Sequence, residues 1–527
     1  MNANTAPSLD AVVVSTGALL PDEVVKVARH LAPIELSAES LAAMAESRAV
    51  IDALVNDTVP HYGVSTGFGA LATKQIPIEL RAQLQRSLIR SHAASSGTEV
   101  AQEVIRGLML NRLSTMATGR TGVRPVVAQT YAALLNAQIT PVVGEYGSLG
   151  CSGDLAPLSH CALAVMGEGK VRNAAGELLD AADALANAGI EPVVLAEKEG
   201  LALINGTDGM LGMLLMASAD LRSLISIADL SAAMSVEGLL GTDNVFAPDL
   251  HALRPHPGQI DSAANMRTIL ADSALIAEQK AGAHKFTRVQ DAYSLRCAPQ
   301  VHGAVRATLA HAESVASYEL ASAIDNPVVT LDGRVESNGN FHGAPMGYVL
   351  DFLAIATADL ASISERRTDR FLDTARSHGL NAFLADDPGV DSGHMIAQYT
   401  AAGIVSELKR LAVPASVDSI PSSAMQEDHV SMGWHAGLKL RKSVDGLARV
   451  LAIELLTSAR ALDMRDGGLS TSKSSPVITA VREAIRAKVE GPATDRYIAP
   501  EIEAVFQLVT DGTLLNAANA ALKTPLA

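Results

Sequence analysis

Five long segments with helical apolar periodicity limit the folds that this chain can adopt. Each segment contains few helix-breaking residues, and stretches with Gly, Pro or Asn separate one from the next. Helices of this length favour an elongated antiparallel bundle, so the fold class is predicted to be mostly α. The predicted helices cover residues 210–240, 301–324, 346–370, 395–411 and 434–464.

The composition supports close helix packing. Alanine is abundant, and aromatic residues make up only 3% of the 527 residues. Alanine has the highest helix propensity, and its small side chain lets helices approach one another. A chain of this length can hold two domains. We place the boundary near Leu203, with a mixed, mainly helical N-terminal domain over residues 1–203 and the elongated central bundle over residues 204–527.

Shorter elements are predicted in the N-terminal part. Residues 12–14 are three valines and predict a short strand, and Pro21 marks the first turn of a helix. Helical periodicity continues over residues 78–91 and 98–116, and residues 170–194 predict a small hairpin region.

Charge and cysteine content exclude several classes of protein. The net charge of −16 argues against a nucleic-acid or anionic-membrane partner. The three cysteines match no zinc spacing, so no metal site is predicted, and they fit a reducing cytoplasm. The N-terminus lacks the basic region of a secretory signal, and charges interrupt every long apolar run, so we expect no membrane span.

A glycine-rich segment, residues 147–160, is compatible with an ordinary loop and also with an unusual cyclisation of the backbone. Its centre is Cys151-Ser152-Gly153, and three glycines in seven residues allow a sharp bend. In such a bend the amide nitrogen of Gly153 can attack the carbonyl carbon of Cys151 with loss of water. Ser152 can then lose its hydroxyl as a second water. The product is a five-membered ring with an exocyclic methylene, which is a strong electrophile.

The surrounding residues resemble the signature of the aromatic amino acid lyases. The segment Gly-Ser-Leu-Gly-Cys-Ser-Gly-Asp-Leu-Ala-Pro-Leu-Ser-His matches the site at which that family forms a methylidene-imidazolone (MIO) group from Ala-Ser-Gly. Here Cys151 replaces the usual alanine, but its side chain lies outside the ring. The resemblance implies an MIO formed autocatalytically from Cys151, Ser152 and Gly153, and no added organic cofactor.

Two further motifs match the family's catalytic positions. Tyr62 opens a glycine-punctuated loop, Tyr-Gly-Val-Ser-Thr-Gly-Phe-Gly, which resembles the loop with the catalytic base. A free tyrosine has a pKa of about 10, so such an enzyme must lower that pKa or work best at alkaline pH. Asn205 precedes Gly206, and the resemblance places its amide beside the electrophile, where it stabilises developing charge.

The resemblance also implies the residues that bind the substrate. Arg296, in Gln-Asp-Ala-Tyr-Ser-Leu-Arg-Cys, corresponds to the clamp for the amino-acid carboxylate, which a guanidinium binds bidentately. Tyr293 belongs to the implied catalytic set and Gln290 to the pocket. Asn326 and Phe341 also fall on pocket positions of the family.

Substrate choice depends on two positions. Ser91-His92 matches the members that act on histidine, whereas members acting on phenylalanine or tyrosine carry Phe-Leu or His-Leu there. Glu427, in Gln-Glu-Asp-His, replaces a glutamine of the phenylalanine enzymes. A carboxylate can hydrogen-bond an imidazole but would be costly against a phenyl ring. The resemblance therefore implies L-histidine as substrate, with trans-urocanate and ammonia as products, and a homotetramer with shared active sites.

Three alternatives remain open from the sequence. A lyase or aminomutase of the same family could act on tyrosine or phenylalanine. A fumarase/aspartase-type lyase is also a helical tetramer, and its Gly-Ser-Ser-x-Met-Pro loop is faintly matched by residues 422–425. A catalytically inactive helical scaffold would form no product from any amino acid.

Overall fold

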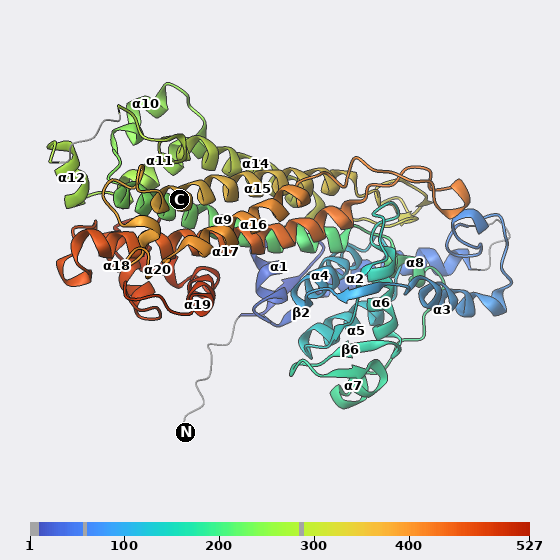
Figure 1. Ribbon diagram of the computed structural model, residues 1–527. Coiled ribbons are helices and arrows are strands. Elements are labelled where there is room, and N and C mark those ends of the chain that lie inside the picture. Colours follow the sequence, from blue (N-terminus) through green and yellow to red (C-terminus); the bar gives the residue numbers. More distant parts are fainter. Residues whose placement is uncertain (1–9, 56–60, 284–288) are drawn as a thin grey trace. The chain divides into compact units, whose positions relative to one another are not determined.

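The computed structural model describes residues 10–55, 61–283 and 289–527 (Figure 1). The chain divides into two compact units, each assembled from segments that are far apart in the sequence. The first unit contains Met1–Ala219, Ala312–Asp351 and Pro414–Leu438, and the second contains Asp220–His311, Phe352–Val413 and Lys439–Ala527. The boundary near Leu203 stays a prediction.

The prediction of a mostly α fold is confirmed, since helices account for 59% of the structure. Each of the five predicted long helices is present, and its ends differ from the prediction by at most a few residues. They are α9 (Asp208–Gly238), α14 (Ala298–Leu320), α15 (Ala344–Leu372), α16 (Met395–Leu411) and α17 (Gly433–Asp466).

Contacts within the second unit give the relative direction of these helices. His394, at the start of α16, lies 3.1 Å from Thr457 near the end of α17, so these two consecutive helices are antiparallel. By contrast, α9 and α17 run parallel, because Arg441 pairs with Asp220 at 2.7 Å and Glu454 accepts a hydrogen bond from Ser235 further along. Alternate members of an up-and-down bundle have this relationship.

A buried charge network joins three helices of the second unit. The carboxylate of Glu454 on α17 pairs with Arg367 on α15 at 2.5 Å, and both side chains are fully buried. It also accepts hydrogen bonds from Ser231 on α9 and Ser364 on α15. Because a buried ion pair is tolerated only when its remaining polar atoms are satisfied, these hydroxyls complete the network.

The first unit is built around α4 (Gln102–Ala117), of which nearly every residue is buried. The predicted strand at residues 12–14 is β1 (Val12–Val14), which pairs in parallel with β2 (Ile34–Leu36). Pro21 is the first residue of α1 (Pro21–Ala28), as predicted.

Three of the shorter predictions need correction. The helix predicted over residues 98–116 begins only at Gln102, because Ser96–Glu99 form β3, which pairs with β5 (Gly144–Tyr146). The helix predicted from residue 78 begins as a 3₁₀ turn before α3 (Arg81–His92). The hairpin region contains β6 (Lys170–Arg172) and β7 (Leu178–Asp180), but a helix, α7 (Ala181–Ala188), follows it.

The remaining α-helices and strands complete the two units. In the first unit they are α2 (Ala38–Leu54), α5 (Pro125–Asn136), β4 (Thr140–Pro141), α6 (Leu155–Val165), α8 (Glu199–Ile204), β8 (Val328–Val329) and β9 (Val335–Glu336). In the second unit they are α10 (Pro248–Ala252), α11 (Pro257–Ile269), α12 (Ala274–Lys280), α13 (Tyr293–Arg296), α18 (Pro476–Arg486), α19 (Ala499–Thr510) and α20 (Thr513–Ala520).

Two of the long helices, α9 and α15, are long and apolar enough to cross a membrane. However, 78% of the most apolar window of α9 and 61% of that of α15 are buried inside the structure. Such burial is typical of the core helices of a bundle, which pass the same test of length and composition.

Candidate active site

A cavity of about 690 Å³ in the first unit brings together residues from distant motifs. Of the residues that the resemblance implied, Tyr62, His92, Ser152, Asn205 and Glu427 line it. Its wall is mostly apolar and comes from the Tyr62 loop, α3 and α8. The other lining residues are Gly67, Phe68, Gly69, Ala70, Leu71, Lys74, Ile76, Leu84, Ser87, Leu88, Ser91, Leu155, Leu201, Ile204 and Ser423.

The Cys151-Ser152-Gly153 segment is bent and lies against Gly206. Gly153 has a φ of +77° and forms a bridge with Gly206, and the next amide, that of Asp154, donates to the Gly206 carbonyl at 2.7 Å. A Cβ on Gly153 would lie 2.1 Å from that carbonyl oxygen. Both the backbone conformation and the available space therefore require glycine at position 153.

The residues before the bend are also held by hydrogen bonds. The Gly150 carbonyl accepts from the Ser431 hydroxyl at 2.8 Å and from the Gly343 amide at 3.0 Å. The Leu149 carbonyl accepts from the Met432 amide at 2.9 Å. Because the flanking residues are anchored on both sides, the three residues between them are held in a bent conformation.

Asp154 anchors the other end of this segment, a role that the sequence analysis did not assign. One oxygen of its fully buried carboxylate accepts from the amides of Gly209 and Met210, each at 2.9 Å, at the start of α9. The other accepts from the Ser148 hydroxyl at 2.9 Å. Burial raises the pKa of Asp154 to about 7, although these donors act in the opposite direction. The signal in the sequence was an acidic residue immediately before a helix, because Asp154 directly precedes α6. Its contacts with the start of α9 could not be read from the sequence.

Glu427 contacts Cys151 and Ser152 directly. Its Oε1 accepts a hydrogen bond from Ser152 Oγ at 3.1 Å, and its Oε2 lies 3.2 Å from Cys151 Sγ. Ser422 Oγ donates to the same Oε2 at 3.0 Å. Burial is the main cause that raises the pKa of the Cys151 thiol to about 11, so the thiol stays protonated and can donate. The sequence analysis placed Glu427 in the pocket but did not foresee these contacts.

Tyr62 faces the cavity, and its hydroxyl accepts a hydrogen bond from the Gly69 amide at 3.3 Å. Its ring meets Phe68 edge to face. Burial raises the pKa of Tyr62 above its ordinary value of 10, and the carboxylates of Glu427 and Asp325 act in the same direction, whereas the Gly69 amide lowers it. In this structure the pKa of Tyr62 is therefore raised rather than lowered.

His92 is one of the residues that line the cavity. Its Nδ1 lies 2.9 Å from the Leu88 carbonyl, which can only accept, so Nδ1 carries the proton in the neutral ring. Nε2 is then left as an acceptor. His92, the last residue of α3, can therefore accept a hydrogen bond from an N–H group of a bound substrate.

Asn205 and Asn326 lie together beside the cavity. The Asn205 amide donates to the Asn326 carbonyl at 3.1 Å. Asn326 in turn accepts from the Asn338 amide at 3.1 Å through its side chain. The backbone carbonyl of Asn205 is held by the fully buried Arg112, which also pairs with Asp208 at 2.6 Å. Asn205 is thus fixed at both its side chain and its backbone.

The structure places Phe341 in the turn before α15, where it is partly buried but does not line the cavity. The next residue, His342, stacks on His429 with ring centroids 5.6 Å apart. Phe341 as a substrate-binding residue stays a prediction.

Gln290, Tyr293 and Arg296 belong to the second unit, around the short helix α13. The guanidinium carbon of Arg296 lies 4.7 Å from the centre of the Tyr293 ring, in a cation–π contact. Its buried Nε has no hydrogen-bond partner among the described residues. A buried guanidinium N–H without an acceptor is costly, which fits a site for an anion. Gln290 is exposed and Tyr293 is 71% exposed.

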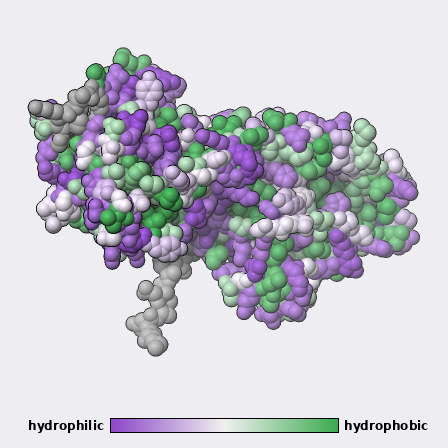
Figure 2. Space-filling view, viewed as in Figure 1, coloured by the Kyte–Doolittle hydropathy of each residue, from purple (hydrophilic) through white to green (hydrophobic). Residues whose placement is uncertain are grey.

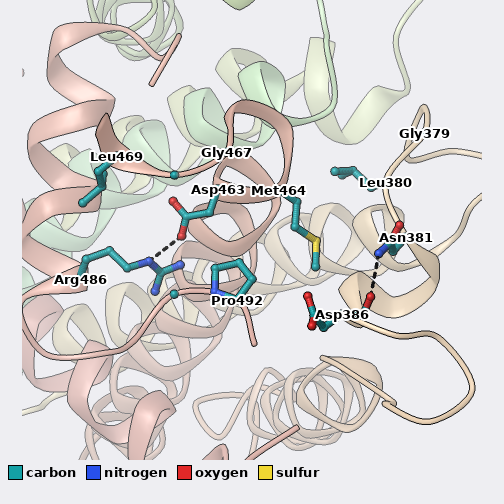
Figure 3. Close-up of a pocket in the computed structure, with 12 residues that line it drawn as sticks. Gly379, Leu380, Asn381, Asp386, Asp463, Met464, Gly467, Leu469, Arg486 and Pro492 are labelled. Atoms are coloured by element: carbon teal, nitrogen blue, oxygen red, sulfur yellow. Dashed lines mark hydrogen bonds and ion pairs between the residues drawn. The ribbon is translucent and has the colours of Figure 1, made fainter. Parts of the chain in front are cut away.

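The second unit contains a different cavity, of about 590 Å³ (Figure 3). Asp463 and Arg486 form an ion pair of 2.7 Å in its wall, and Asn381 donates to the backbone carbonyl of Asp386. None of the motif residues lines it. Across the described parts of the chain, no group of three or more His, Cys, Asp or Glu side chains could hold a metal ion.

The comparisons with known proteins agree with this geometry. The model of the family described as "Aromatic amino acid lyase" matches residues 19–487. The chain is 63% identical to a histidine ammonia-lyase of Streptomyces avermitilis over 97% of this chain and 98% of that protein. A histidine ammonia-lyase structure from Trypanosoma cruzi is 37% identical, with a TM-score of 0.88 and coverage of 97% and 96%. A tyrosine aminomutase structure from Streptomyces globisporus is also 37% identical, with a TM-score of 0.91 and coverage of 98% and 100%.

Proposed function

The chain belongs to the aromatic amino acid lyase family, and we propose that it is a histidine ammonia-lyase, which eliminates ammonia from L-histidine to give trans-urocanate. The observation that carries this proposal is one cavity in which Ser152, the base candidate Tyr62 and the polar pair His92 and Glu427 line the same wall. A protonated imidazole has two N–H donors, one for each of these two acceptors, whereas a phenol has one donor and a phenyl ring has none.

The prosthetic group implied for this site is an MIO formed from Cys151, Ser152 and Gly153. The residues fit such a group, because Gly153 adopts a positive φ against Gly206 where no side chain can be placed, and hydrogen bonds hold the segment on both sides. When formed, the ring supplies an electrophile that draws electrons from the amino acid. No added organic cofactor is then required.

The residues of this chain divide the remaining work. The Tyr62 phenolate accepts the β-proton of the substrate, with Gly69 holding its oxygen. Nε2 of His92 and the carboxylate of Glu427 hold and orient the imidazole. Asn205, fixed by Asn326, supports the charge that develops beside Ser152. The apolar part of the wall excludes water, which strengthens each of these polar interactions.

Arg296 is the proposed partner of the amino-acid carboxylate. Its guanidinium is a fork of N–H donors, and its Nε has no hydrogen-bond partner within the described structure. Tyr293, close to it in sequence, is proposed as a catalytic residue and Gln290 as a substrate-binding residue. Asn326 and Phe341 are proposed as further pocket residues.

A second candidate, a tyrosine or phenylalanine ammonia-lyase or aminomutase of the same family, is favoured by the likeness to a tyrosine aminomutase. The presence of Glu427 and His92 in one cavity argues against it, because a phenyl ring has no donor for these two acceptors and a phenol has only one. The two activities give different products, so one assay separates them.

We propose that the enzyme is a homotetramer with shared active sites. On α15, Tyr348, Phe352 and Ile355 are 50%, 46% and 47% exposed and repeat at helical spacing, so they form one apolar face. The face of the molecule shown in Figure 2 likewise carries hydrophobic residues among hydrophilic ones. A face of this kind is typical of surfaces that pack against another subunit. Sedimentation should show four chains per particle.

We further propose that the protein works in the cytoplasm. All three cysteines are free, and Cys151 and Cys161 are buried. Free thiols persist in a reducing compartment.

The test measures the reaction product and the intact mass of the protein. Purified protein incubated with L-histidine should show the ultraviolet absorbance of urocanate, with much weaker formation of coumarate from tyrosine or cinnamate from phenylalanine. Its intact mass should be two waters below the encoded mass. Ser152→Ala should keep at least the second water, because it has no hydroxyl to lose, and it should lose nearly all turnover. The control Ser159→Ala, which only loses a hydrogen bond inside α6, should behave like the wild type. Coumarate or cinnamate as the main product would move the assignment to the second candidate.

A further inference from the structure

We infer that Glu427 also acts before any substrate binds, as the acid that removes the Ser152 hydroxyl when the ring forms. The inference rests on the proposed function, since it concerns how the proposed MIO is made. It adds a maturation step to a residue whose other proposed role is to hold the imidazole.

The contacts with the open peptide carry the inference. Of the two oxygens of Glu427, Oε1 lies 3.1 Å from Ser152 Oγ, the atom that must leave. This is a hydrogen-bond distance, and proton transfer needs no movement of the backbone. Binding of the substrate ring alone does not require a hydrogen bond from Glu427 to the Ser152 hydroxyl, because that hydroxyl is lost when the ring forms.

Two neighbours fix the other oxygen. Ser422 Oγ donates to Oε2 at 3.0 Å, and the Cys151 thiol lies 3.2 Å from the same atom. The backbones of Ser422 and Glu427 also exchange hydrogen bonds, Ser422 N to Glu427 O at 2.8 Å and the reverse at 3.3 Å. Ser422 and Cys151 are therefore positioning residues. They leave Oε1 as the oxygen aimed at Ser152.

The step balances with groups already present. After Gly153 N has bonded to the Cys151 carbonyl carbon and one water has left, the Ser152 Cα–H bond breaks and its electrons form the Cα=Cβ double bond. The Cα proton passes by way of water to the Glu427 carboxylate, the group that accepts the hydrogen bond from Oγ. The carboxylic acid formed in this way gives the proton to Oγ as the Cβ–Oγ bond breaks, so a second water leaves and the carboxylate is restored.

The test follows ring formation by intact mass at timed intervals after a short pulse of synthesis, without reference to turnover. Glu427→Gln keeps the size and the hydrogen bond but cannot act as the acid. Loss of the second water should slow by about 10²-fold or more, the usual contribution of general acid catalysis. Asp428→Asn, which alters the neighbouring exposed carboxyl, is the matched control and should mature like the wild type.

Chemical rescue separates the acid from a merely structural role. Glu427→Ala should retain the second water, and acetate or formate should restore its loss in a dose-dependent manner, whereas chloride at equal ionic strength should not. Ser422→Ala should slow the step by a smaller factor. If the wild type loses two waters and Glu427→Gln loses them at the same rate, the role of Glu427 as the acid is overturned, whereas the ring itself is not. A wild-type chain at its full encoded mass would overturn the ring and this role together.

Discussion

Lys198 Nζ and Asp325 Oδ2 lie 2.5 Å apart in an ion pair whose two side chains are completely buried. Lys198 immediately precedes α8, the helix that ends just before Asn205, and Asp325 immediately precedes Asn326. The pair therefore joins the two chain segments that hold the asparagines of the site. Its removal should affect stability more than a surface pair of the same kind would.

Lys198→Met should destabilise the protein by about 3–5 kcal/mol, because it leaves the Asp325 carboxylate buried without a partner. Denaturant unfolding measures this difference. The matched control is Lys170→Met, whose pair with Asp180 is exposed by more than half on both sides. That change should cost less than about 1 kcal/mol. Equal costs for the two substitutions would mean that the buried pair contributes no more than a surface one.

The pH dependence of turnover should follow Tyr62. Burial raises the pKa of this phenol above 10, so only a small fraction is ionised at neutral pH, and that fraction grows about tenfold with each pH unit below the pKa. Because the phenolate is the active form of a base, kcat/KM should rise through the alkaline range rather than fall. A profile that is flat from pH 7 to pH 10 would remove Tyr62 from the role of base.

The same residue can be tested by substitution. Tyr62→Phe keeps the edge-to-face contact with Phe68 but removes the base, and it should lower kcat by about 10²–10⁴-fold and abolish the alkaline rise. Tyr146→Phe, at a site 56% exposed, should change neither the rate nor the profile.

Much of the fold could be read from local sequence. Residues 395–411 coincide with α16 because their apolar periodicity stops abruptly at both ends. The start of α4 was misplaced by four residues, because Ser96–Glu99 pair with a strand more than 40 residues away, and no local pattern encodes such pairing.

The candidate site, like the fold, was predictable from the sequence only in part. Motifs identified Tyr62, Ser152 and Glu427 separately, and the structure brings them to one cavity. The contact between Glu427 and Cys151 spans 276 residues and could not be predicted from either motif. The ion pair of Lys198 with Asp325 could not be predicted either. A lysine and an aspartate far apart in the sequence are expected to be solvated charges unless their burial is known.

His92 should determine the preference for an imidazole. His92→Phe removes the Nε2 acceptor, and the loss of one hydrogen bond to the substrate, worth about 1.4 kcal/mol, should raise KM for L-histidine about tenfold. Steady-state kinetics with histidine and with phenylalanine measure the change in preference. Because the ring-forming residues are untouched, intact mass should still show the loss of two waters. Unchanged histidine kinetics would place His92 outside the substrate contacts.

Arg296 should bind the substrate carboxylate through the planar fork of its guanidinium as well as through its positive charge. Arg296→Met removes the guanidinium and should lower kcat/KM by about 10–100-fold, as expected for a charge-assisted hydrogen bond of about 1.5–3 kcal/mol. Arg296→Lys keeps the charge but not the planar fork, so it should recover only part of this loss. Arg410→Met, a substitution at an exposed arginine of α16, should have no effect. Full recovery by lysine would show that Arg296 supplies only charge, and the unpartnered Nε would then have no part in the bidentate contact.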